Sequence, residues 1–88
     1  MTESVITSGE RLAVPERVIV APASGNFRPV SHDDRGQDVA EEQVIGFVDG
    51  GGHSTPVRSP FRGFLMGLLA HAGERVREGQ PVAWLRTA

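Results

Sequence analysis

The 88-residue sequence contains no cysteine, and this absence excludes disulfides, thiolate metal ligands and a thiol nucleophile. It contains no lysine either: arginine supplies all nine basic residues, so no side chain carries a primary amine. Long hydrophobic runs are also missing, because none approaches the roughly 20 apolar residues needed to span a bilayer. We therefore expect a small domain without covalent cross-links, and no membrane partner.

The net charge and the first ten residues indicate which partners and which location to expect. A formal net charge of −2 gives no electrostatic reason to expect nucleic acid as a partner. Residues 1–10 are polar, carry an acid at Glu3, and lack the basic and apolar regions of a signal peptide. We therefore predict a flexible N-terminal tail over residues 1–10, one domain over residues 11–88, and a cytoplasmic location.

The second half of the chain repeats the first. Val20–Phe27 corresponds to Arg58–Leu65 with an offset of 38 residues, and both segments contain Pro-x-x-Gly. Gly36–Phe47 corresponds to Gly73–Trp84 with an offset of 37 residues, and glycine, valine and glutamine recur there at the same spacing. A duplicated unit of this size cannot bury its apolar face alone, whereas two copies packed on each other can.

Short apolar segments separated by glycine and proline predict an all-β domain. Strands are predicted at residues 12–14, 18–20 and 43–48, and again from Pro56 onward. Phe27–Val30 is a poorer match to a strand, because Arg28 and Pro29 break the alternation of apolar and polar residues. Each copy is expected to form one sheet, and the two sheets are expected to pack about a pseudo-two-fold axis.

One run admits two interpretations. Phe64–His71 has apolar residues at helical spacing, but Gly63 and Gly67 each disfavour a helix by about 1 kcal/mol. The first copy has no helical pattern at the equivalent place, so we interpret this run as a strand.

Apolar residues at equivalent positions of the two copies predict the core. Ile45 and Phe47 are expected to face inward from the last strand of the first copy, as are Val82 and Trp84 in the second. Further core residues are expected just after turns and in the second Pro-x-x-Gly segment: Val39, Val76, Phe61, Phe64 and Leu65.

The repeated segments resemble a known family. Ser59–Phe64, followed by Gly73–Leu85, is similar to the second half of biotinyl and lipoyl attachment domains, and the outline recurs in the first half. The resemblance covers residues 18–86. It implies an all-β fold, a flattened β-barrel or barrel-sandwich hybrid made of two quasi-symmetric four-stranded halves.

The family carries its cofactor on a lysine in the hairpin that joins the two halves, within Met-Lys-Met for biotin or Asp-Lys-Ala for lipoate. The family spacing, counted back from Pro60, places that acceptor at Gly52, with Gly51 and His53 at the flanking positions. No amine is present there, so we expect no biotin, lipoate or other cofactor. The candidate partner-contact hairpin comprises Gly50, Gly51, Gly52, His53 and Ser54.

The sequence offers two further candidate sites: the glycine-rich loop before His53 and a group of possible metal ligands. The glycines before His53 lack the lysine and helix of a phosphate-binding loop, and His53 and Ser54 are expected on opposite faces of a strand. No catalytic residue is therefore expected. A metal site could combine the cluster at residues 32–34 (His32, Asp33 and Asp34) with His53 or His71, but too few ligands converge and none is expected. His71 is interpreted as an exposed turn residue.

Three functions of different classes are considered, the first two from the resemblance and the third from His53 and Ser54. The first is a non-catalytic binding or assembly module, related to biotin carboxyl carriers, that docks on a carboxylase-like or acyltransferase-like enzyme. The second is a nominal biotin or lipoyl carrier subunit that has lost cofactor attachment. The third is a small-ligand or catalytic protein that uses the hairpin tip. A monomer or a weak homo-oligomer is expected in each case.

Overall fold

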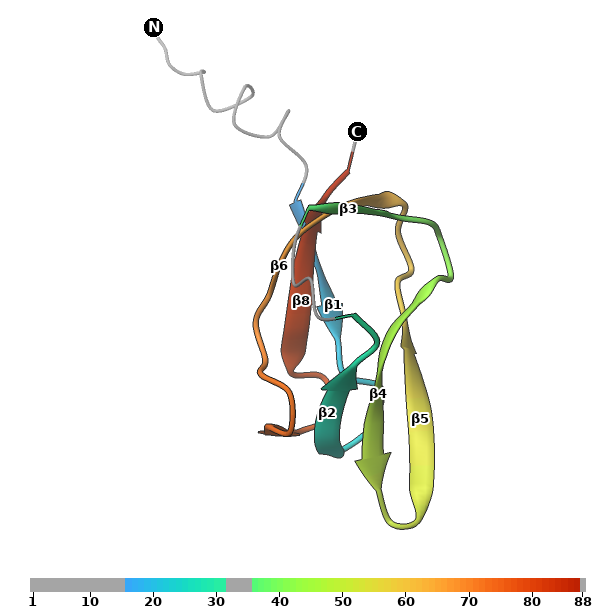
Figure 1. Ribbon diagram of the computed structural model, residues 1–88, viewed down its shortest axis with the longest axis vertical. Coiled ribbons are helices and arrows are strands. Elements are labelled where there is room, and N and C mark those ends of the chain that lie inside the picture. Colours follow the sequence, from blue (N-terminus) through green and yellow to red (C-terminus); the bar gives the residue numbers. More distant parts are fainter. Residues whose placement is uncertain (1–15, 32–35, 88) are drawn as a thin grey trace, which may run out of the picture.

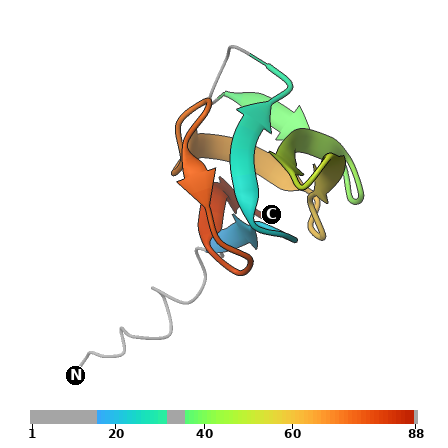
Figure 2. The same cartoon turned by 90° about the horizontal axis from the view of Figure 1, so that it is seen from below.

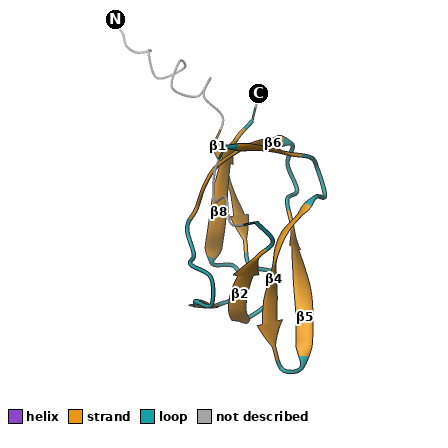
Figure 3. Ribbon diagram, viewed as in Figure 1, coloured by secondary structure: helices purple, strands orange, loops and turns teal. Residues whose placement is uncertain are grey.

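The computed structural model describes residues 16–31 and 36–87, which form eight β-strands and no helix (Figures 1 and 3). The strands are β1 (Glu16–Val20), β2 (Gly25–Pro29), β3 (Gln37–Val39), β4 (Val44–Gly50), β5 (His53–Arg58), β6 (Gly63–Leu68), β7 (Arg75–Val76) and β8 (Pro81–Arg86). Within these residues, no segment forms a helix that could cross a membrane.

The strand predictions compare well with this structure. The predicted strands at 18–20 and 43–48 correspond to β1 and β4, and the ambiguous run from Phe64 is strand β6 rather than a helix. Pro29 does not prevent a strand at Phe27, since it occupies the last position of β2. The predicted strand at 12–14, the tail over 1–10 and the start of the domain at residue 11 lie outside the described residues.

The strands form two four-stranded antiparallel sheets, with orders β1-β8-β6-β3 and β5-β4-β2-β7. Exchanging each strand of the first copy with its counterpart four strands later converts one order into the other, which confirms the pseudo-two-fold relation. The expectation that each copy forms its own sheet is wrong. Each sheet takes two strands from each copy, because interleaving lets each copy supply hydrogen-bond partners to the other.

The two sheets surround a shared interior without closing into a barrel, as in a flattened barrel-sandwich hybrid (Figure 2). The all-β fold class is therefore confirmed. Buried apolar residues from both sheets fill the interior: Ile19, Ala21, Phe27, Val39, Ile45, Val48, Val57, Leu65, Ala70, Val76, Val82, Ala83 and Leu85.

Two of the predicted core residues face the other way. Phe47 and Trp84 are only half-buried, whereas the residues that follow them, Val48 and Leu85, are buried. The physical cause is a pair of equivalent β-bulges, in which Ile45 and Val82 are extra residues relative to the neighbouring strand. Each bulge shifts the alternation by one position, so the aromatic ring is placed on the outer face of the sheet.

Phe64 was also predicted to lie in the core, and this prediction is wrong. It is 42% exposed, because it precedes the buried Leu65 in β6 and therefore points to the opposite face. Phe61 is partly buried and packs against the core, and Val39 and Val76 are buried as predicted.

The repeat extends to the hydrogen bonds of the turns before β4 and β8. In each turn a glutamine side chain, Gln43 or Gln80, accepts the backbone N–H of the residue three positions earlier, at 2.9 and 3.1 Å respectively. The residue before each glutamine has a positive φ, 72° at Glu42 and 88° at Gly79. Glu42 thus adopts a left-handed backbone conformation, for which the counterpart position in the second copy has a glycine, Gly79.

Candidate functional site: the β4–β5 hairpin

The candidate hairpin is formed by β4 and β5, and it extends beyond the neighbouring strands at one end of the molecule (Figure 1). Gly50 pairs with His53, so only Gly51 and Gly52 lie between the strands. Both glycines have positive φ, 60° and 80°, as the central residues of a type I′ turn require. The next strand was predicted to start at Pro56; it starts at His53, because this two-residue turn needs no longer loop.

Close backbone packing fixes the base of the hairpin. A Cβ atom on Gly50 would lie 2.9 Å from the carbonyl oxygen of Ser24, and one on Gly25 would overlap the Asp49 carbonyl. The counterpart of Gly25 is Gly63, where a Cβ atom would lie 2.7 Å from the carbonyl oxygen of Arg86. Glycine is therefore needed at these positions so that neighbouring segments of the same copy can approach each other, in the first copy at Gly25 and Gly50 and in the second at Gly63.

A polar network braces the hairpin on the outer face of its sheet. Arg28 on β2 donates two hydrogen bonds to the Asp49 carboxylate, from Nε at 2.8 Å and from Nη2 at 3.1 Å. Ser54 on β5 donates from Oγ to Oδ1 of the same carboxylate at 2.6 Å. The Arg28 guanidinium also lies over the Phe47 ring, 4.6 Å from its centroid. Three neighbouring strands are thereby linked.

The network lowers the pKa of Asp49 to about 2, because Arg28 and then Ser54 hydrogen-bond to the charged form. A carboxylate with so low a pKa is a weak general base, so it does not activate the Ser54 hydroxyl. His53 is exposed, and Ser54 bonds to Asp49. The arrangement therefore suits a rigid, solvent-facing projection rather than nucleophilic chemistry.

The remaining predicted site residues are not gathered around the hairpin. His71 lies in an exposed turn, as expected. His32, Asp33 and Asp34 are outside the described residues. Among residues 16–31 and 36–87, no group of three or more metal-ligating side chains is found.

Sequence reasoning missed the bracing residues Arg28 and Asp49. They are 21 positions apart in the chain and become neighbours only because β2 pairs with β4. Their opposite charges were a signal, but the register of the two strands was needed to bring them together.

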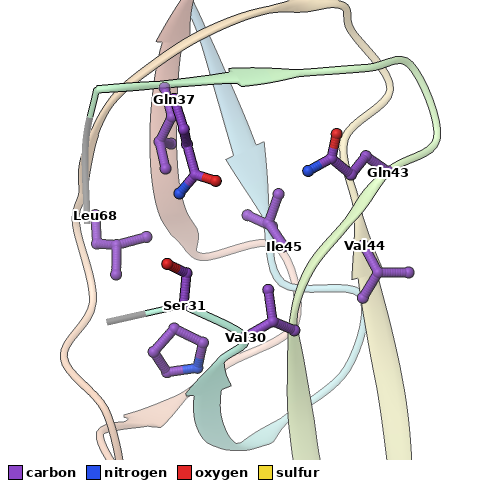
Figure 4. A pocket seen from close by; sticks show the side chains of 9 residues that line it. Val30, Ser31, Gln37, Gln43, Val44, Ile45 and Leu68 are labelled. Carbon is purple, nitrogen blue, oxygen red and sulfur yellow. The ribbon is translucent and has the colours of Figure 1, made fainter. Parts of the chain in front are cut away.

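A small cavity lies elsewhere, between the sheets beside the end of β2 (Figure 4). Its volume is about 20 Å³, and its lining combines Val30, Ile45 and Leu68 with the polar Ser31, Gln37 and Gln43. This is room for about one water molecule, far below the roughly 300 Å³ at which small-molecule pockets begin. The cavity is therefore not a binding site for an organic cofactor.

No protein family model matches the sequence, and no curated protein matches it. Solved structures do share the fold. The urea carboxylase of Kluyveromyces lactis superposes with a TM-score of 0.71 at 19% identity, over 81% of this chain and 6% of that chain. A single-chain, multi-domain long-chain acyl-CoA carboxylase gives a TM-score of 0.73 at 16% identity, over 83% of this chain and 7% of that one.

A third likeness is to a succinylglutamate desuccinylase/aspartoacylase from Rhodobacter sphaeroides. Its TM-score is 0.60 at 23% identity, over 80% of this chain and 21% of that chain. The present chain thus spans only a small part of each of these proteins. The likenesses show the fold, and they show that this fold occurs as one unit within larger enzymes.

Proposed function

We propose that this chain is a biotin carboxyl carrier-like, lipoyl-like domain without the acceptor lysine. In this proposal it is not an enzyme; it is a binding or assembly module that docks on a carboxylase-type or acyltransferase-type enzyme. The similarity to small portions of two carboxylases and the resemblance of the repeated segments both support this assignment.

The observation that carries the proposal is the state of the hairpin. Its turn, its close-packed base and its polar brace are all present, yet the position of the family's acceptor is occupied by Gly52. A projecting hairpin without an amine cannot form the amide link to biotin or lipoate. It can still present a rigid surface to an enzyme that recognises carrier domains.

Contact with the enzyme is assigned to the hairpin tip, residues Gly50, Gly51, Gly52, His53 and Ser54. His53 is the exposed side chain nearest the turn and can donate or accept a hydrogen bond. Because Arg28 and Asp49 hold the hairpin, little conformational entropy is lost on docking.

The test uses purified chain and the purified biotin carboxylase and carboxyltransferase components of the same source, with binding measured by calorimetry. We expect binding that is weakened at least about fivefold by His53→Ala, since interface side chains that matter cost more than about 1 kcal/mol on truncation. His71→Ala is the matched control, because this histidine is also exposed but lies in a different turn. Equal binding by both variants would refute the assignment of the contact to the hairpin tip, and no binding by the wild type would refute docking on a carboxylase.

The alternative function is a nominal carrier subunit that has lost cofactor attachment. It is distinguished from the docking module by whether the chain changes the enzyme that it binds. Incubation with biotin ligase or lipoate ligase should leave the intact mass of the chain unchanged in either case, since no lysine is present. Only the docking module has to alter the activity or the assembly of the bound enzyme. An enzyme whose kcat, KM and oligomeric state are identical with and without the chain would favour the nominal carrier.

A further inference from the structure

The outer faces of the two sheets are related by the pseudo-two-fold axis but differ in chemistry. In the sheet that contains the hairpin, the Arg28 guanidinium covers the half-buried Phe47 and is held by Asp49. In the other sheet the counterpart of Phe47 is Trp84, and the counterpart of Arg28 is Met66. The position of the arginine that caps Phe47 is thus apolar in the second copy, and Trp84 itself pairs with Gly67, which has no side chain to cover it.

Exposed apolar side chains gather on this second face, the outer face of sheet β1-β8-β6-β3. Val18 is 48% exposed and pairs across the strands with Trp84, and Phe64 is 42% exposed on β6. In the described part of the chain, no strand of the other sheet carries a large hydrophobic residue as exposed as these. Exposed apolar side chains gathered on one face of a sheet are typical of an interaction site.

A charged row crosses the same face. Asp38 on β3 pairs with Phe64 on β6, and Phe64 pairs with Arg86 on β8, so the three side chains stand side by side. The row therefore reads acid, aromatic, base, with a second acid, Glu16 on β1, paired with Arg86 at its far end; Asp38, Phe64 and Arg86 are all exposed. They also line a hollow together with Met66.

We propose that a second copy of this chain docks on this face, with a two-fold axis running along β6 through Phe64. Such an axis places Phe64 against its own copy and Arg86 of each copy opposite Asp38 of the other. The row is thus complementary to itself, as a two-fold interface requires.

The existing ion pair does not compete with this contact. Arg86 is 3.2 Å from Glu16, but both side chains are 48% exposed, so that pair contributes little to stability. The guanidinium has five N–H donors and can serve a second carboxylate. Because the exposed apolar residues are few, the dissociation constant is expected at about 10–1,000 µM.

A dimer formed in this way leaves both hairpins accessible, because β4 and β5 belong to the other sheet. The two tips would be presented on one rigid body, which raises the apparent affinity for any partner with paired sites. The proposed contact rests on the Asp38–Phe64–Arg86 row and on the exposure of Phe64, and it stands independently of the proposed function.

The test is sedimentation velocity over a concentration series, with the emission of Trp84, the chain's one tryptophan, followed in parallel. The wild type should approach twice the monomer mass at high concentration, with a blue shift of emission. Asp38→Arg and Arg86→Asp each place like charges opposite each other, so each should associate at least about tenfold more weakly. An equimolar mixture of the two variants should dimerise again, because every charge then meets its opposite.

Recovery in the mixture also shows that both variants are folded. Arg75→Asp is the control, since Arg75 is the counterpart of Asp38 on the other sheet, and it should leave dimerisation unchanged. A wild type that stays monomeric up to about 1 mM overturns the proposal. A dimer that is insensitive to both charge reversals also overturns the proposal. So does a blue shift of Trp84 emission that appears only when an enzyme is added.

Discussion

Introducing a lysine into the hairpin is the sharpest perturbation that the structure offers. Gly52→Lys would place an amine at the tip, and a Cβ atom there meets nothing within 4 Å, so no neighbour has to move. The cost is conformational: the residue has a φ of 80°, where a side chain costs about 1–2 kcal/mol. For 88 residues a total stability of about 4–13 kcal/mol is typical, so the variant should remain folded.

Two measurements follow from this substitution. Urea unfolding should show a loss of about 1–2 kcal/mol. Incubation of the variant with biotin, ATP and a biotin ligase should then yield biotinylated chain, detected by intact mass. The triple variant Gly51→Met, Gly52→Lys, His53→Met restores the flanking residues of the family and should be modified faster, at a further cost of about 1–2 kcal/mol for the second glycine.

Gly73→Lys is the matched control. Gly73 has a φ of 84° and the same open space around a Cβ atom, but it lies in a different turn. It should lose as much stability as Gly52→Lys and should not be biotinylated. If the folded triple variant stays unmodified, or the control is modified equally, the hairpin does not have the geometry that a ligase recognises and the carrier-like interpretation fails.

Three further predictions concern stability. Glu42→Gly should raise the free energy of unfolding by about 1 kcal/mol, because Glu42 has a φ of 72° where its counterpart Gly79 is glycine; a lower Tm would contradict this. Gly63→Ala should lower it by about 1–3 kcal/mol, since the added Cβ would lie 2.7 Å from the Arg86 carbonyl oxygen; an unchanged urea midpoint would contradict the packing argument. The folded-state pKa of Asp49, about 2, lies below its ordinary 3.8, so its stabilising contribution is present above about pH 4 and is lost as pH falls towards 2. Asp49→Asn should abolish that part of the pH dependence of Tm, and identical profiles would count against it.

Local patterns were enough to predict most of the strands and the hairpin. The run of glycines predicted a tight turn because only glycine adopts positive φ values freely, although the turn proved to be two residues long, Gly51 and Gly52, with β5 starting at His53 rather than at Pro56. The bulges at Ile45 and Val82 were not predictable, since a bulge is defined by the partner strand. Without them, Phe47 and Trp84 were assigned to the wrong face.

The sequence by itself determined that this protein has two equivalent halves, a glycine turn between them, and no amine for covalent attachment of a carrier group. These properties depend on residue identity and short-range conformational preference. Only the tertiary structure decided that the halves interleave, that Arg28 braces Asp49, and that Phe64 lies in the open between Asp38 and Arg86. Those outcomes depend on strand register, which the packing of the whole core selects.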